Sequence, residues 1–209
     1  MREVSPIAGM SVDEYVGFIQ SQDREGWAVL GPILNEIRSQ KNSGERRKPS
    51  VQLIDTSNVM TASQRRALLD KVAELVDENW CGRSEMCLQF AMLLHAALQD
   101  LGIRSRIATG TATYFDERGR KLHDWWHAWV RIGQEVVDGN VDCLDENLCV
   151  PKAVRVRPYW GPITDTPKDR QIREDRSSQR FSSEIDVSKF WWPDLKRWLD
   201  ETGWRQHRD

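Results

Sequence analysis

A cysteine, a histidine and an aspartate in this chain have the types and the order that a thiol-based catalytic site requires. Cys87 stands at the start of an apolar helical pattern, and His127 and Asp138 follow in two β-rich segments. A carboxylate can orient an imidazole, and the imidazole can take the proton of a thiol, so the trio could perform nucleophilic acyl chemistry. Alone, each residue has a simpler structural role, such as a small core cysteine. The hypothesis therefore depends on the elements that bring the three together.

The helical pattern around Cys87 predicts where its thiol lies. Apolar residues recur at helical spacing and form one stripe: Cys87, Phe90, Ala91, Leu94, Leu98 and Leu101. Gly102 predicts the end of this helix, because glycine is favoured just past the C-terminus. Cys87 is therefore expected at or beside the first turn, where free N–H groups and the positive end of the helix dipole favour a thiolate.

The two β-rich segments predict a hairpin that brings His127 near Asp138. Gly133-Gln134 has glycine at the first central position, as a type II′ turn requires. In the resulting register His127, Trp129 and Asp138 share one face, and His127 and Asp138 are diagonal neighbours roughly 7–8 Å apart at the backbone. The other face carries the apolar set that we expect in the core: Ala128, Val130, Ile132 and Val137.

Other polar residues could take part in the same site. Asn140 would lie opposite His127 in this register and is an alternative orienter of the imidazole, and Asp142 is a second alternative if a bulge shifts the strand. His123 lies farther along the same face as His127. His95 falls within the helical pattern, where we expect a structural role.

In several ordered motifs the chain resembles the transglutaminase-like superfamily. The resemblance spans roughly residues 79–142 and is carried by Cys87-Leu88-Gln89-Phe90-Ala91, Leu101-Gly102-Ile103-Arg104-Ser105-Arg106, Gly110, His127-Ala128-Trp129-Val130 and Val137-Asp138. It implies a papain-like α+β fold in which the helix bearing the nucleophile packs on an antiparallel β-sheet. It also implies thiol chemistry on a peptide or protein amide: hydrolysis, deamidation or transamidation. Carried over by position, Cys87 is the nucleophile, His127 the base and Asp138 the orienter.

The chain departs from the family pattern in two places. Arg104-Ser105 replaces the usual Pro-Ala, and Met86 stands where some members carry a glutamine before the cysteine. The backbone N–H of Cys87 is therefore the first expected oxyanion donor. Trp80 and Gln89 are the side-chain candidates for the second, although both also suit packing roles.

The rest of the chain predicts three regions. Residues 1–50 form a helical extension, begun by a capping box at Ser11-Val12-Asp13-Glu14 and closed by a polar linker from residue 38. Residues 51–165 form the catalytic core, with a strand at 51–54 and a helix from Thr61 to about Glu78. A second capping box, Thr61-Ala62-Ser63-Gln64, begins this helix, and its apolar face consists of Leu68, Leu69, Val72, Leu75 and Val76. Residues 166–209 carry a charged, mobile loop over 168–183 and a Trp-rich C-terminal helix with Pro193 in its first turn.

Composition excludes several classes of function. The formal net charge of −2 gives no general attraction to nucleic acid or to an anionic membrane. No apolar run has membrane-spanning length, and the first residues lack the apolar segment of a signal peptide. We therefore expect a cytoplasmic protein with reduced cysteines. No calcium-loop pattern is present, and we expect neither a metal nor another cofactor.

Two alternatives belong to other classes of function. Cys81 and Cys87 are six residues apart, as are Cys143 and Cys149, so four thiolates, or a mixed set with His123 or His127, could bind structural zinc. These spacings are longer than those of common zinc sites. The second alternative is a protein-binding domain of the same fold that has lost its chemistry; the intact trio argues against it.

Overall fold

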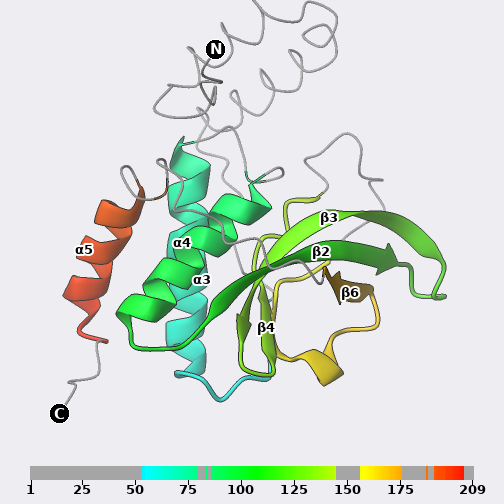
Figure 1. The fold of residues 1–209 in the computed structure, drawn as a ribbon, viewed down its shortest axis with the longest axis horizontal. Coiled ribbons are helices and arrows are strands. Elements are labelled where there is room, and N and C mark those ends of the chain that lie inside the picture. The colour runs from blue at the N-terminus through cyan, green and yellow to red at the C-terminus, as the bar shows by residue number, and fades with distance from the viewer. Residues whose placement is uncertain are drawn as a thin grey trace, which may run out of the picture.

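A computed structural model describes residues 53–79, 83, 86–144, 156–175, 187 and 191–204. In these residues the chain is α+β, with three α-helices gathered beside a curled, mixed sheet of six strands (Figure 1). The helical extension and linker predicted for residues 1–50 lie outside the described residues.

Helix α3 (Ala62–Asn79) begins at the predicted capping box. The Gln64 backbone N–H donates to Thr61 Oγ1 at 3.3 Å, and the Thr61 backbone N–H donates to Gln64 Oε1 at 2.9 Å. Two backbone donors of the first turn are thereby satisfied reciprocally. The predicted apolar face is buried, and it consists of Leu68, Leu69, Val72, Leu75 and Val76.

Helix α4 (Cys87–Asp100) starts at the predicted cysteine and stops where Gly102 predicts. The Ile103 N–H donates to Leu98 O at 2.8 Å, and the Gly102 N–H donates to Gln99 O at 3.0 Å. This pair of bonds is a Schellman motif, and Gly102 adopts the left-handed conformation that the motif requires, with φ of +80°.

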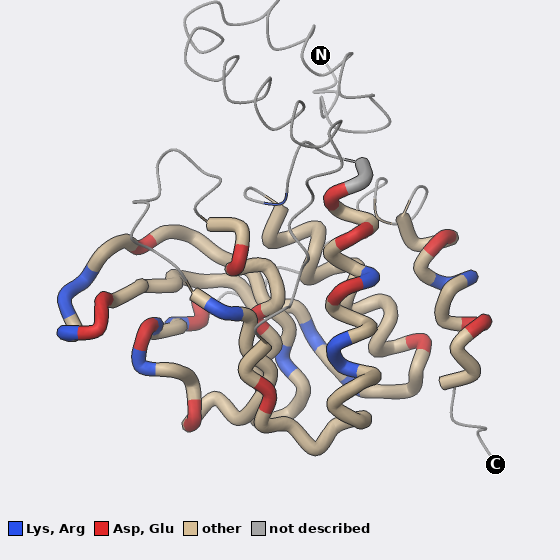
Figure 2. The backbone as a smooth tube through the Cα atoms, turned by 180° about the vertical axis from the view of Figure 1, so that it is seen from behind, with Lys and Arg blue, Asp and Glu red and all other residues tan. Residues whose placement is uncertain are grey.

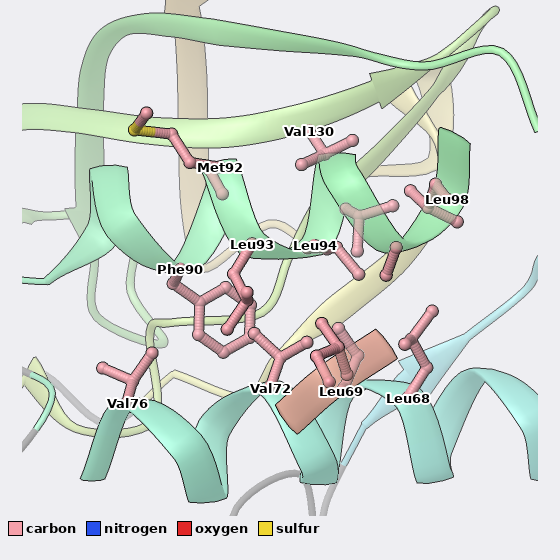
Figure 3. Close-up of a cluster of buried hydrophobic side chains, with 14 of the residues drawn as sticks. Leu68, Leu69, Val72, Val76, Phe90, Met92, Leu93, Leu94, Leu98 and Val130 are labelled. Carbon is pink, nitrogen blue, oxygen red and sulfur yellow. The ribbon is translucent and has the colours of Figure 1, made fainter. Parts of the chain in front are cut away.

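Helix α4 is buried on more sides than its apolar stripe predicts. Every residue of the stripe is buried, and so are Met92, Leu93 and Ala97. Figure 3 shows the reason: α4 lies between α3 on one side, contacted through residues such as Phe90 and Leu93, and the sheet on the other, near Val130. The Cys87 helix is therefore the centre of the main core.

The sheet has the strand order β1-β5-β4-β3-β2-β6. The strands are β1 (Ile54–Asp55), β2 (Arg106–Phe115), β3 (Lys121–Ile132), β4 (Glu135–Asp138), β5 (Tyr159–Pro162) and β6 (Arg170–Glu174). All neighbours are antiparallel except β1 and β5, which are parallel. The prediction of an antiparallel sheet is thus correct for the β2–β3–β4 meander but wrong at β1, because β5 inserts from a distant part of the chain.

The β3–β4 hairpin has the predicted register. Val130 pairs with Val137, and Ile132 pairs with Glu135. Gly133, the first central residue of the turn, has φ of +57°, and Gln134, the second, has a negative φ. This combination is that of a type II′ turn. The apolar face of the hairpin packs against the helices, through Ala128, Val130, Ile132 and Val137.

The charged segment after residue 166 is partly a strand, so the prediction of a mobile loop over 168–183 is wrong for its described part. Strand β6 pairs antiparallel with β2 at the edge of the sheet, Tyr114 opposite Arg170 and Gly110 opposite Glu174. Backbone pairing needs no apolar side chains, and the one fully buried cation of this strand, Arg170, is neutralised by carboxylates. Residues 176–183 lie outside the described residues.

Helix α5 (Trp192–Thr202) agrees with the predicted C-terminal helix, with Pro193 in its first turn. Its buried Leu195 and Leu199 join the core formed around α4. In the described part of the chain, no helix combines the length and apolar character needed to cross a bilayer. Acidic and basic positions are intermixed along the same part of the chain (Figure 2).

Candidate active site

His127 and Asp138 form the fully buried hydrogen-bonded pair that the hairpin register predicts. His127 Nε2 and Asp138 Oδ1 are 2.7 Å apart, and both side chains are inaccessible to solvent. The bond leaves the other ring nitrogen, Nδ1, with no hydrogen-bond partner among the described residues. One nitrogen of the imidazole is therefore held by a carboxylate, and the other is available to a reacting group.

Arg170 holds the second oxygen of Asp138. Its Nη1 donates to Asp138 Oδ2 at 2.9 Å, its Nε donates to Asp169 Oδ1 at 2.9 Å, and its Nη2 donates to the backbone carbonyl of Arg157 at 2.5 Å. Both oxygens of Asp138 are thus fixed by charged partners. Sequence reasoning missed Arg170 because it stands in a run of charged residues, and only the pairing of β6 with β2 brings it to Asp138.

Cys87 reaches this pair from the first turn of α4. Strand β4 ends at Asp138, and the next residue, Gly139, passes so close to Phe90 of α4 that an added Cβ would lie 2.6 Å from a ring carbon. The start of α4 therefore lies at the end of β4. The Cys87 thiol is close enough to His127 to raise the pKa of the imidazole. Cys87 is buried, with 8% of its surface exposed.

The buried charges set the protonation of the site. Burial by itself lowers the pKa of His127, but Asp138, through its charge and hydrogen bond, and Cys87 outweigh it and raise that pKa to about 10. Burial by itself raises the pKa of Asp138, but His127 and Arg170 hold it below its ordinary value. At neutral pH the site therefore contains an imidazolium and a carboxylate.

Asn140 and Asp142, the alternative orienters, contact Arg83 instead of His127. Asn140 Nδ2 donates to the Arg83 backbone carbonyl at 2.8 Å, and Arg83 donates from Nη1 to Asn140 Oδ1 at 3.3 Å and from Nη2 to Asp142 Oδ2 at 2.8 Å. Because β4 ends at Asp138, the strand alternation that would place Asn140 opposite His127 does not continue. Both residues instead tie the segment before α4 to the segment after β4, and so hold Cys87 near Asp138.

The remaining predicted residues do not enter this arrangement. Gln89 is half-buried in the first turn of α4, and His123 packs edge-on against the Trp125 ring. His95 Nδ1 hydrogen-bonds the Ser105 hydroxyl at 2.8 Å, in keeping with its expected structural role. Trp80, Cys81 and Cys149 lie outside the described residues. In the part of the chain that is described, no three His, Cys, Asp or Glu side chains meet as metal ligands. Cys87 is a free thiol, and Cys143 Sγ lies 3.7 Å from the backbone carbonyl oxygen of Asn140.

We expect the stability of the fold to decrease between pH 6.5 and 10 because of His127. The folded state keeps its proton up to about pH 10, whereas the unfolded chain releases it near the ordinary value of about 6.5. In this window the native state binds more protons, so the free energy of unfolding decreases as pH rises, by at most about 1.4 kcal/mol per pH unit. Urea unfolding at pH 6.5, 8 and 9.5 measures the slope.

His95 supplies the matched control for this slope. Burial lowers the pKa of His95, so its linkage acts below the ordinary value and not in the alkaline window. His95→Gln should keep the alkaline decrease of the wild type, whereas His127→Gln should make it shallower. Identical alkaline slopes in wild type and His127→Gln would show that His127 carries no proton in this range.

No protein-family model, curated protein or solved structure matches this chain. An assignment of function therefore depends on the geometry of Cys87, His127, Asp138 and Arg170.

Proposed function

We propose that this protein is a cysteine-dependent acyl-transfer enzyme of the transglutaminase-like kind, with a papain-like core. The single observation that carries the proposal is the buried His127–Asp138 pair, whose free Nδ1 is left to the thiol at the start of α4. Helix α4 and the β3–β4 hairpin, which are separated in the chain by β2, converge to make this contact. A histidine with only a structural role would not need a thiol, placed at the start of a helix, beside its second ring nitrogen.

The first half of the reaction uses Cys87 as nucleophile. The imidazolium of His127 and the N–H groups in the first turn of α4 stabilise the thiolate form of Cys87 that attacks the substrate. Cys87 Sγ attacks the carbonyl carbon of an amide, a C–S bond forms, and the carbonyl electron pair moves onto oxygen. When the carbonyl reforms, the C–N bond breaks and the leaving amine takes the proton from His127 Nδ1. The product is a thioester on Cys87.

The second half resolves the thioester. Neutral His127 accepts a proton at Nδ1 from the incoming water or amine, whose oxygen or nitrogen bonds to the carbonyl carbon while the C–S bond breaks. Water gives a carboxylic acid, as in proteolysis or deamidation, and an amine gives a new amide. Asp138 stays ionised throughout and holds Nε2 protonated, which keeps Nδ1 directed at the thiol.

The nucleophile is tested by alkylation with iodoacetamide. We expect Cys87 to be modified before Cys143, at a rate that changes little between pH 6 and 8, whereas the rate for an ordinary thiol rises about tenfold per pH unit. Peptide mapping identifies the modified cysteine. The proposal fails if Cys87 stays inert while another cysteine, such as Cys81, reacts.

A matched variant separates activation from accessibility, because Cys87 is also slightly more exposed than Cys143. His127→Gln leaves the Cys87 position in place but removes the imidazolium. Its Cys87 should react slowly and with the pH dependence of an ordinary thiol. Equal rates in wild type and His127→Gln would mean that exposure alone explains the labelling.

The reaction class is tested with dimethylated casein as the probe. New amino termini report peptide hydrolysis, released ammonia reports deamidation, and incorporation of dansylcadaverine reports transamidation. At least one of these signals should disappear in Cys87→Ala. Alkylation at Cys87 without any of the three signals would favour a binding domain that has kept the pair but lost turnover.

A further inference from the structure

Several buried donors on the His127 face of the sheet have no hydrogen-bond partner among the described residues. They are Tyr114 Oη, Trp125 Nε1, His127 Nδ1 and Trp129 Nε1. In the β2–β3 register Tyr114 pairs with His123, Ala112 with Trp125 and Gly110 with His127, so these side chains project from the same face. Buried polar groups are almost always paired in native proteins, so a concentration of unpaired donors beside a thiol indicates a group that they bind.

Tyr114 is the donor most closely surrounded by the site. Its side chain has 0% exposure, and on β6 its register partner is Arg170, which holds Asp138. The charges of Asp138, Arg170 and Cys87 all act on its hydroxyl, and the Trp125 indole lies beside it. Burial raises the pKa of Tyr114 well above its ordinary value, so the phenol stays neutral and remains a donor.

Trp125 links Tyr114 to the base. Its ring stacks against the His127 imidazole, with centroids 6.3 Å apart and planes 17° apart. Trp129 also neighbours His127 but belongs to a separate cluster with Tyr159 and Val136. Tyr114 and Trp125 share a cluster. The unpaired O–H and N–H that accompany Cys87 are therefore those of Tyr114 and Trp125.

We propose that Tyr114 Oη, assisted by Trp125 Nε1, forms the side-chain part of the oxyanion hole for the acyl transfer proposed above. The inference rests on that function. As Cys87 Sγ bonds to the carbonyl carbon, the electron pair of the carbonyl moves to oxygen, and the two donors hydrogen-bond that oxygen without transferring a proton. The carbonyl reforms when the leaving group departs, and both donors are released. The acceptor is the carbonyl oxygen of an ester or amide, which the sheet binds through Tyr114 and Trp125 instead of through Trp80 or Gln89.

Two reactions of Cys87 separate the oxyanion hole from the nucleophile. Alkylation by iodoacetamide displaces iodide and develops no oxyanion, whereas acylation by p-nitrophenyl acetate passes through one. In Tyr114→Phe we expect alkylation to stay within about twofold of wild type and the acylation burst to slow by about 100-fold, the usual effect of removing one oxyanion donor. Trp125→Phe keeps a ring against His127 and should also slow acylation more than alkylation.

Thermal unfolding supplies a readout that a packing role would not reproduce. Tyr114→Phe removes a buried hydroxyl without a partner, so its Tm should not decrease. The matched control is Tyr159→Phe, because the Tyr159 hydroxyl donates to the Pro162 carbonyl at 2.7 Å. That variant should lower Tm but leave the ratio of acylation to alkylation unchanged.

The outcomes distinguish the two proposals. If wild type acylates at Cys87 and Tyr114→Phe acylates equally fast, the oxyanion assignment is overturned and the acyl-transfer function stands. If Tyr114→Phe loses alkylation and acylation in equal measure, Tyr114 supports the thiol and does not bind the oxyanion. If Cys87 of the wild type reacts with neither reagent, the proposed function itself falls, and this inference with it.

Discussion

Replacing Asp138 with alanine is expected to lower the free energy of unfolding by roughly 3–5 kcal/mol. The variant leaves two buried cations without their shared carboxylate: Arg170, whose side chain is 0% exposed, and protonated His127. Desolvated charges are tolerated only when they are paired, so the loss exceeds the energy of the two hydrogen bonds alone. Urea unfolding at pH 7 measures it directly.

The asparagine variant separates catalysis from stability at the same position. Asp138→Asn keeps the volume of the side chain and one oxygen acceptor. The neutral amide cannot balance the charge of His127, and it favours the Nε2-protonated form of the imidazole less than the carboxylate does. We expect acyl transfer at Cys87 to fall by about 10³–10⁴-fold, more than the loss of stability explains. Asp124→Asn is the control, because Asp124 lies on β3 with its side chain 45% exposed. If both asparagine variants retain activity, Asp138 does not orient the base.

Replacing Arg83 with methionine is also expected to lower the free energy of unfolding by roughly 3–5 kcal/mol. The Arg83 side chain is 1% exposed, and it bonds Asn140 and lies 2.8 Å from Asp142 and 3.8 Å from Asp77. Its loss leaves those carboxylates facing a buried methyl group. Because Arg83 joins the segment before α4 to the segment after β4, we also expect Cys87 in this variant to be alkylated more slowly at a temperature where the fold persists.

Arg106 offers the matched control for Arg83. It also makes two hydrogen bonds to a carboxylate, that of Glu174, but its side chain is 53% exposed. Ion pairs in water contribute about 0–1 kcal/mol, so Arg106→Met should unfold almost as the wild type does. Similar destabilisation in both variants would mean that pairing, and not burial, governs the effect at Arg83.

Local sequence determined the elements that carry the trio. The capping box at Thr61 and Gln64 and the glycine at position 102 placed the ends of α3 and α4. The turn at Gly133 fixed the β3–β4 register, and with it the meeting of His127 and Asp138. These features depend on neighbours within a few residues, where side-chain spacing and backbone conformation decide the structure.

The tertiary structure alone decided what surrounds the trio. Arg170 meets Asp138 because β6 pairs with β2, and Arg83 bonds Asn140 and Asp142 because β4 ends at Asp138. Tyr114 is buried because Val141, Leu144 and Val156, from the chain between β4 and β5, pack in the same cluster. Such contacts join residues that are far apart in the chain, and the strands that form them, β5 and β6, have no apolar alternation to reveal them. A buried charge is stabilised by the partner that the tertiary structure places beside it. The type and spacing of a residue in the sequence do not identify that partner.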